Sequence, residues 1–174
     1  MTKPELAIAI YDVAHLTGEF LLRSGTISNE YFDKYLFEAN PKLLKAIAKE
    51  FSLLVPSDTE VLAGLEMGGI PLATALGLET GLPLAFVRKK AKDYGTRKVS
   101  EGASVEGKKT LIIEDVITTA GQLLLSAAEL RENGAIITNA LCVIDRESGG
   151  SDKCKEIGIT LQSLFTMTQL KQTR

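Results

Sequence analysis

The chain has 174 residues, of which 45% are hydrophobic and 24% are charged, as in ordinary globular proteins. A chain of this length favours a single domain that can bury a real core. Its formal net charge of −2 excludes a general electrostatic attraction to nucleic acid or to an anionic membrane surface.

The setting that the sequence indicates is reducing and cytoplasmic. Cys142 and Cys154 form neither a CxxC motif nor a disulfide framework. No apolar stretch approaches the roughly 20 residues that a membrane span requires. Charged residues interrupt the N-terminal apolar segment, so we expect no signal peptide.

The first part of the chain predicts a helix over residues 4–16, short strands within residues 17–37 and a second helix over residues 40–55. The strands flank a turn at Ser24 and Gly25. Asn40 is a suitable N-cap for the second helix, and Pro41 suits its first helical position.

Strands and helices alternate from residue 60 onward. Strands are predicted over residues 60–66, 83–90, 109–116, 136–145 and 160–167, and helices over residues 68–81, 120–135 and 150–158. This alternation is typical of an α/β protein with a mainly parallel sheet. Such sheets bind ligands at the carboxyl ends of their strands, so functional residues should follow strands.

The stretch TLIIEDVITTAGQ, residues 110–122, has this arrangement. An apolar strand leads to Glu114 and Asp115, and Thr118 and Thr119 follow in a turn before a helix. The backbone amides, hydroxyls and helix N-terminus of such a turn suit phosphate. The two acids suit sugar hydroxyls, or a hard cation and its waters. Together they indicate a sugar phosphate, bound with magnesium; the alternative is an acidic strand end with a Thr-rich helix cap and no ligand.

Two other chemistries are disfavoured. Residues 102–109 approach the phosphate-binding P-loop pattern, but Lys109 stands where Ser or Thr is needed, and the stretch precedes a strand. His15 is the only histidine and falls in the first predicted helix. We therefore interpret it as a partly exposed helix residue, and expect neither a histidine metal site nor a catalytic triad.

Residues 110–122 resemble the phosphoribosyl-diphosphate (PRPP) signature of the type I phosphoribosyltransferases. Within that group, residues 86–102 resemble the mobile catalytic loop of the orotate phosphoribosyltransferase family. Residues 143–150 resemble its strand ending in an Asp-Arg pair, and residues 18–33 resemble its N-terminal hood. The resemblance implies a type I phosphoribosyltransferase fold, with a mainly parallel five-stranded sheet flanked by helices. It divides one domain into a hood, about residues 1–38, and a core, about residues 39–174.

The resemblance also implies an activity: transfer of the phosphoribosyl group from PRPP to orotate, with Mg²⁺, in a homodimer with shared active sites. The implied PRPP-binding residues are Arg88, Lys89, Lys92, Tyr94, Glu114, Asp115, Val116, Ile117, Thr118, Thr119, Ala120, Gly121 and Gln122. Thr118 and Arg146 are implied to hold the orotate carboxylate. Lys92 and Asp115 are implied to be catalytic, with magnesium held mainly through PRPP. Residues 63–69 would touch the diphosphate.

Three positions depart from the family pattern. Tyr94 stands where many members have His in the mobile loop, Arg23 where many have Lys in the hood, and Gly68 where many have Lys in the diphosphate loop.

Residues 91–102 are predicted to be mobile without ligand, because Gly95 and Gly102 flank a charged stretch with few core-type residues.

Two rival functions stay open. One is a phosphoribosyltransferase for another base, although a purine would have little use for an arginine that binds a carboxylate. The other is a PRPP-sensing regulator without turnover, which the single-domain length and the slightly negative charge disfavour.

Overall fold

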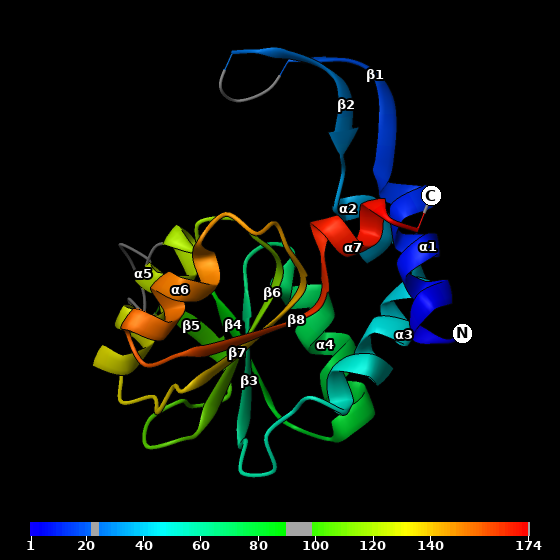
Figure 1. Cartoon of the computed structure of the whole chain (residues 1–174). Coiled ribbons are helices and arrows are strands. Elements are labelled where there is room, and N and C mark those ends of the chain that lie inside the picture. Colours follow the sequence, from blue (N-terminus) through cyan, green and yellow to red (C-terminus); the bar gives the residue numbers. More distant parts are fainter. Residues whose placement is uncertain (22–24, 90–98, 174) are drawn as a thin grey trace.

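The computed structural model describes residues 1–21, 25–89 and 99–173 and arranges them around one central sheet (Figure 1). The sheet has the strand order β5-β4-β3-β6-β7-β8. The strands are β3 Val61–Leu65, β4 Leu84–Val87, β5 Ser100–Gly102, β6 Thr110–Ile117, β7 Asn139–Asp145 and β8 Thr160–Thr166. Five of them pair in parallel, and β5 adds an antiparallel edge to β4. The predicted α/β class with a mainly parallel sheet is confirmed, and β5 is an addition to the predicted five strands.

Strand β5 lies within the segment of residues 91–102 that is predicted to be mobile. Ser100 pairs with Val87 and Gly102 pairs with Ala85, so the last part of this segment is an edge strand of the sheet. A three-residue strand ending in glycine has neither an apolar run nor high β-propensity, which is why sequence patterning does not reveal it. The earlier part of the segment, through residue 98, lies outside the described residues.

Helices cover both faces of the sheet, giving three layers (Figure 1). One face carries α1 Lys3–Ala14, α3 Pro41–Ser52 and α4 Gly69–Thr80, and the other carries α5 Gly121–Glu132 and α6 Gly150–Glu156. On β6, Leu111 and Ile113 pack into the core shared with α1, α3 and α4, whereas Ile112 packs into the core shared with α5. Successive strand residues point to opposite faces. A strand buried on both faces therefore needs the unbroken apolar run seen before Glu114.

Local signals set the helix ends as predicted. The Asn40 side chain accepts hydrogen bonds from the backbone N–H groups of Lys42 and Leu43, at 3.1 and 3.3 Å, and Pro41 is the first residue of α3. Gly134 has φ +85° just beyond α5, a left-handed conformation that glycine adopts without strain.

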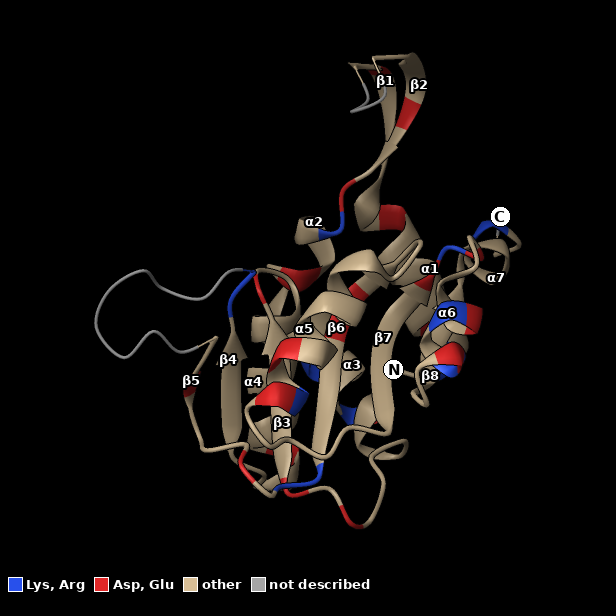
Figure 2. Ribbon diagram, turned by 90° about the vertical axis from the view of Figure 1, so that its left-hand side faces the viewer, with Lys and Arg blue, Asp and Glu red and all other residues tan. Residues whose placement is uncertain are grey.

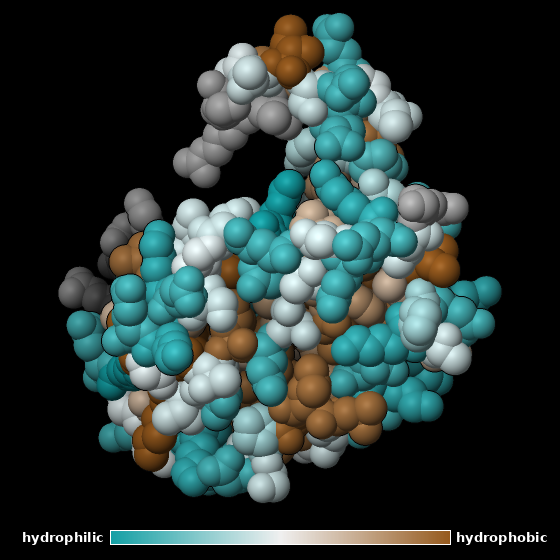
Figure 3. Space-filling model, in the orientation of Figure 1, coloured by the Kyte–Doolittle hydropathy of each residue, from teal (hydrophilic) through white to brown (hydrophobic). Residues whose placement is uncertain are grey.

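The N-terminal segment continues into a hairpin that rises above the carboxyl end of the sheet (Figure 1). Its strands are β1 His15–Leu21 and β2 Ile27–Phe32, followed by α2 Tyr35–Glu38. Helix α7, Met167–Lys171, contacts α1 near the base of the hairpin. Figure 3 shows apolar surface at the far end of the hairpin, where Leu21 and Ile27 are exposed.

Helices α2 and α7 are absent from the sequence prediction, since elements of four and five residues are too short to show a helical period. Among the described residues, no helix has the length and apolar character needed to cross a bilayer.

Candidate active site

The acid pair lies inside the last part of β6, which continues past it to Ile117. Both carboxyl groups are buried: Glu114 is 8% exposed and Asp115 is 1% exposed. Glu114 accepts the Asp115 N–H at 3.0 Å, and Asp115 Oδ1 accepts the Val116 N–H at 2.5 Å. The carboxyl groups are therefore held by the strand that carries them, and in this structure they do not face solvent.

Helix α2 closes the site over Asp115. The Lys34 ammonium lies 2.6 Å from Asp115 Oδ2, and the Glu38 side chain is buried beside the same oxygen. Glu38 Oε1 is buried, and no described group donates a hydrogen bond to it. An ionised carboxylate there would be costly, whereas a protonated one can itself be the donor.

Burial and mutual repulsion shift the ionisation of these groups. Burial, and then the charge of Asp115, raise the pKa of Glu38 to about 8. The same causes, in the same order, raise the pKa of Glu114 well above its ordinary value. Burial lowers the pKa of Lys34, but the hydrogen bond and charge of Asp115 outweigh it and the net pKa is raised. The pKa of Glu38 thus lies above neutral pH, so this carboxyl is mostly protonated there.

The loop from Thr118 to Ala120 joins β6 to α5. Thr118 and Thr119 are exposed, and Ala120 has φ 58° and is the residue before the first helical residue, Gly121. A left-handed alanine is strained by about 1 kcal/mol or more, as is common at ligand-binding loops. The predicted phosphate-binding residues thus form one continuous turn at a helix N-terminus, where backbone N–H groups attract anions.

A glycine outside the predicted site supports this loop. A Cβ atom at Gly150, the first residue of α6, would lie 2.6 Å from the Thr118 carbonyl oxygen and 2.5 Å from the Ile117 side chain. Only a residue without a side chain lets α6 approach so closely. The double glycine of Gly149 and Gly150 is the signal in the sequence, but its meaning depends on a contact between distant elements.

Basic residues follow β4 at the same end of the sheet (Figure 2). Arg88 lies 3.8 Å from Glu101 of β5, and its backbone N–H donates to the Val99 carbonyl. The Lys89 N–H donates to the Glu66 carboxylate at 2.5 Å, which fixes the start of the basic segment to the loop after β3. The remaining predicted residues of this group, Lys92 and Tyr94, lie outside the described residues, as does Arg23 of the hairpin.

Arg146 directly follows β7, the neighbour of β6. The Arg146 backbone N–H donates to the Ile117 carbonyl at 2.8 Å. This bond places Arg146 beside the loop of Thr118 to Ala120, called here the phosphate loop. The adjacent acids are engaged elsewhere, since Asp145 accepts the Glu147 N–H and Glu147 accepts the Thr168 N–H. In the described part of the chain, Arg146 forms no ion pair with either acid, so its guanidinium is not used in a local surface pair.

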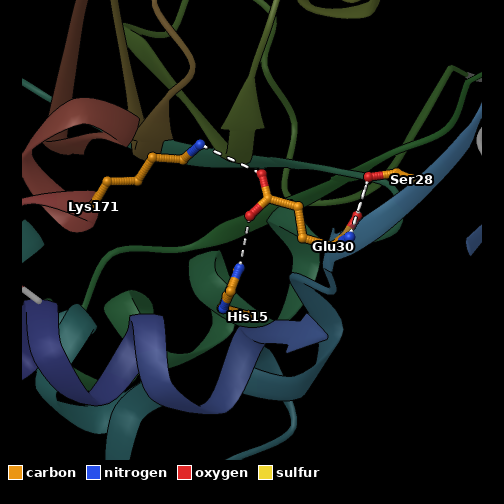
Figure 4. Close-up of polar contacts among 4 residues, drawn as sticks. All are labelled: His15, Ser28, Glu30 and Lys171. Atoms are coloured by element: carbon orange, nitrogen blue, oxygen red, sulfur yellow. Dashed lines mark hydrogen bonds and ion pairs between the residues drawn. The ribbon is translucent and has the colours of Figure 1, made fainter. Parts of the chain in front are cut away.

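Arg146 lines a cavity of about 260 Å³ between the hairpin and the end of the sheet. The other lining residues come from α1, the hairpin and α7: Tyr11, His15, Ser28, Glu30, Tyr31, Phe32, Met167 and Lys171. Glu30 of β2 lies 3.0 Å from His15 of β1 and 3.6 Å from Lys171 (Figure 4). The first contact links the two strands of the hairpin, and the second links the hairpin to α7. His15 is therefore the first residue of β1 and bonded to Glu30, which corrects its interpretation as a helix residue.

A family model for the phosphoribosyl transferase domain matches residues 36–165, from α2 to β8. The chain is thus a member of the phosphoribosyltransferases. An orotate phosphoribosyltransferase from a Nocardioides species is 46% identical over 169 residues, covering 97% of this chain and 94% of the relative. One from Methanocella arvoryzae is 42% identical, with 88% and 87% covered. The chain therefore belongs to the orotate phosphoribosyltransferase family.

A solved structure agrees with this assignment. Mycobacterium tuberculosis orotate phosphoribosyltransferase, in complex with Fe(III) dicitrate, superposes with a TM-score of 0.86 at 26% identity, covering 97% of this chain and 98% of the other. The predicted type I phosphoribosyltransferase fold is confirmed.

Proposed function

We propose that this protein transfers the phosphoribosyl group of PRPP to orotate, giving orotidine 5′-monophosphate and diphosphate. The observation that carries the proposal is the junction of β6 and β7. There the Arg146 N–H donates to the Ile117 carbonyl just before the loop of Thr118 to Ala120, and Arg146 lines a cavity of about 260 Å³. A guanidinium is a good bidentate partner for a carboxylate.

The proposed roles follow the positions of the residues. Glu114 and Asp115 receive the ribose hydroxyls, and residues 117–121 hold the 5′-phosphate, with Val116 and Gln122 also in contact with PRPP. Arg88 and Lys89, together with Lys92 and Tyr94 from the segment outside the described residues, bind the diphosphate. Thr118 and Arg146 orient orotate.

The chemistry requires little acid–base work from the protein. Orotate N1 gives up its proton to solvent and bonds to the anomeric carbon with inversion, through an oxocarbenium-like transition state. The bond from that carbon to the diphosphate oxygen breaks, and its electron pair leaves with diphosphate. The protein positions two anions and stabilises the charge on the leaving group. Lys92 supplies the main cationic contact to that group.

Magnesium fits this site as an ion held mainly through the diphosphate oxygens of PRPP. Both Asp115 oxygens are already engaged, one by Lys34 and one by the Val116 N–H, so this carboxylate is not free to be a dedicated ligand. When bound, the ion would neutralise part of the diphosphate charge.

We also propose a cytoplasmic homodimer in which each active site uses residues of both chains. The buried free thiols of Cys142 and Cys154 suit a reducing compartment. Within one chain, residues 1–38 would act as the hood over a core of residues 39–174.

Separate substitutions at the two halves of the site test the assignment. Arg146→Ala should raise the KM for orotate strongly, because truncating one partner of a charged pair costs about 2–5 kcal/mol, and change the KM for PRPP little. Asp115→Asn should instead weaken PRPP binding, because an amide replaces only part of the acceptor capacity of a carboxylate.

Lys153→Ala, an exposed residue on α6, is the control and should change neither KM. Equal losses for both substrates in the Arg146 variant would contradict the proposed orotate site.

A further inference from the structure

Lys34 is outside the residues assigned to either substrate, yet it contacts the central acid of the site. It is the residue just before α2, and its ammonium lies 2.6 Å from Asp115 Oδ2. The Tyr35 ring lies 5.3 Å from the same ammonium. Two thirds of the Lys34 side chain is covered, since its exposed fraction is 33%. The pair is therefore partly shielded from solvent, unlike an ordinary surface ion pair.

The diphosphate loop cannot supply this cation from its own position nearest to Asp115. A Cβ atom at Gly68 would lie 1.7 Å from Asp115 Oδ2 and 2.8 Å from Glu38 Oε1. The two acids fill the space that a side chain at residue 68 would need. Asp115 Oδ2 occupies the space next to Gly68. Lys34, at the start of α2, contacts this same oxygen.

The charge of Asp115 needs this partner when PRPP arrives. PRPP is a polyanion, and it must bind beside three carboxyl groups, those of Glu38, Glu114 and Asp115. Burial raises the pKa of both Glu38 and Glu114, which disfavours their charged forms. The Lys34 ammonium lies 2.6 Å from Asp115 Oδ2 and brings a positive charge to this end of β6, which reduces the repulsion of the phosphates.

We propose that Lys34 is a PRPP-positioning residue, which holds the Asp115 carboxylate in one orientation and cancels its charge. This inference rests on the proposed function, since it assumes that PRPP binds at the end of β6. The role assigned to Lys34 is therefore exerted through Asp115.

Three variants test the role. Lys34→Met keeps most of the length of the side chain and removes its charge, whereas Lys34→Arg keeps the charge. Lys108→Met is the matched control. It also removes a lysine ion pair, since Lys108 lies 3.0 Å from Glu60. Lys108 precedes β6 and therefore lies at the end of the strand away from the site. Calorimetric titration with PRPP and Mg²⁺ gives Kd, and steady-state kinetics give the KM for each substrate.

Lys34→Met should raise the Kd and KM for PRPP about tenfold or more, and the KM for orotate by less than about twofold. Lys34→Arg should restore most of the PRPP affinity, and Lys108→Met should match the wild type. Unchanged PRPP affinity in Lys34→Met, or an equal rise in both KM values, would overturn the inference.

A double-mutant cycle with Asp115→Asn shows whether Lys34 acts through Asp115. The double variant has no charge at either position, so it can be measured even if Lys34→Met alone does not fold. In that background, Lys34→Met should cost little further PRPP affinity, since the charge that Lys34 balances is gone. An undiminished effect would refute the positioning role. If the wild type itself bound no PRPP, both the proposed function and the inference would fail. If the wild type binds PRPP and the Lys34 variants behave like it, only the role of Lys34 is refuted.

Discussion

The buried carboxyl of Glu38 makes the stability of the fold depend on pH in a predictable direction. Its pKa is about 8 in the folded protein, against an ordinary value of 4.5. Between these values the folded state keeps a proton that the unfolded chain releases. The stability contributed by this group is therefore complete below pH 4.5 and is lost as the pH rises through about 8.

Glu38→Gln removes this loss. The glutamine amide has the shape of the protonated carboxyl and can donate to Asp115 Oδ2 in the same way, but it cannot ionise. The full effect of the pKa change is bounded by about 1.4 kcal/mol per pH unit. Because Lys34 and the loop at Gly68 can relax around an ionised Glu38, we expect the variant to gain about 1–3 kcal/mol over the wild type between pH 5 and pH 8.5.

Urea unfolding of both proteins at pH 5 and pH 8.5 measures this difference. Glu132→Gln, at an exposed position on α5, is the control and should show no such pH-dependent gain. The reasoning is wrong if the difference between Glu38→Gln and the wild type is the same at both pH values, or if the variant is the less stable protein at pH 8.5.

Three further predictions concern the site. Gly68→Ala should raise the Kd for PRPP about tenfold in calorimetry while the fold survives, because the new methyl displaces the Asp115 carboxylate and not backbone. Gly150→Ala should cost about 1–3 kcal/mol in urea unfolding and also weaken PRPP binding, because its methyl meets the Thr118 carbonyl oxygen. Mixing inactive Lys92→Ala and Asp115→Ala proteins should restore roughly a quarter of wild-type activity if sites are shared in a two-fold dimer. Subunit exchange shown by mass spectrometry without recovered activity would reject shared sites.

The sequence was sufficient to predict the parts of the fold that local patterns determine. Apolar runs and glycine-started helices predict the parallel sheet, and Asn40 with Pro41 marks the start of α3. The loop after β6 is predicted because parallel strands present their carboxyl ends at one edge. The role of Arg146 after β7, in contrast, is implied only by the family resemblance.

The cover over the acid pair could not be predicted in this way. Lys34 and Glu38 belong to a helix of four residues, and they meet Asp115 and Gly68 only through tertiary packing. Nothing in the local sequence shows that the absence of a side chain at residue 68 makes room for two acids. The role of Gly150 could not be predicted for the same reason. Gly150, at the start of α6, lies against Thr118, in the loop that leads to the start of α5, only through tertiary packing.

The measurement that tests the central claim most directly is the consumption of orotate by the purified protein, followed spectrophotometrically with PRPP and Mg²⁺. We predict loss of orotate only when PRPP is present, with orotidine 5′-monophosphate identified by mass spectrometry and no turnover of hypoxanthine or uracil in its place. Turnover of another base in preference to orotate would contradict the assigned substrate. PRPP binding without turnover of any base would instead indicate a sensor and contradict the enzyme.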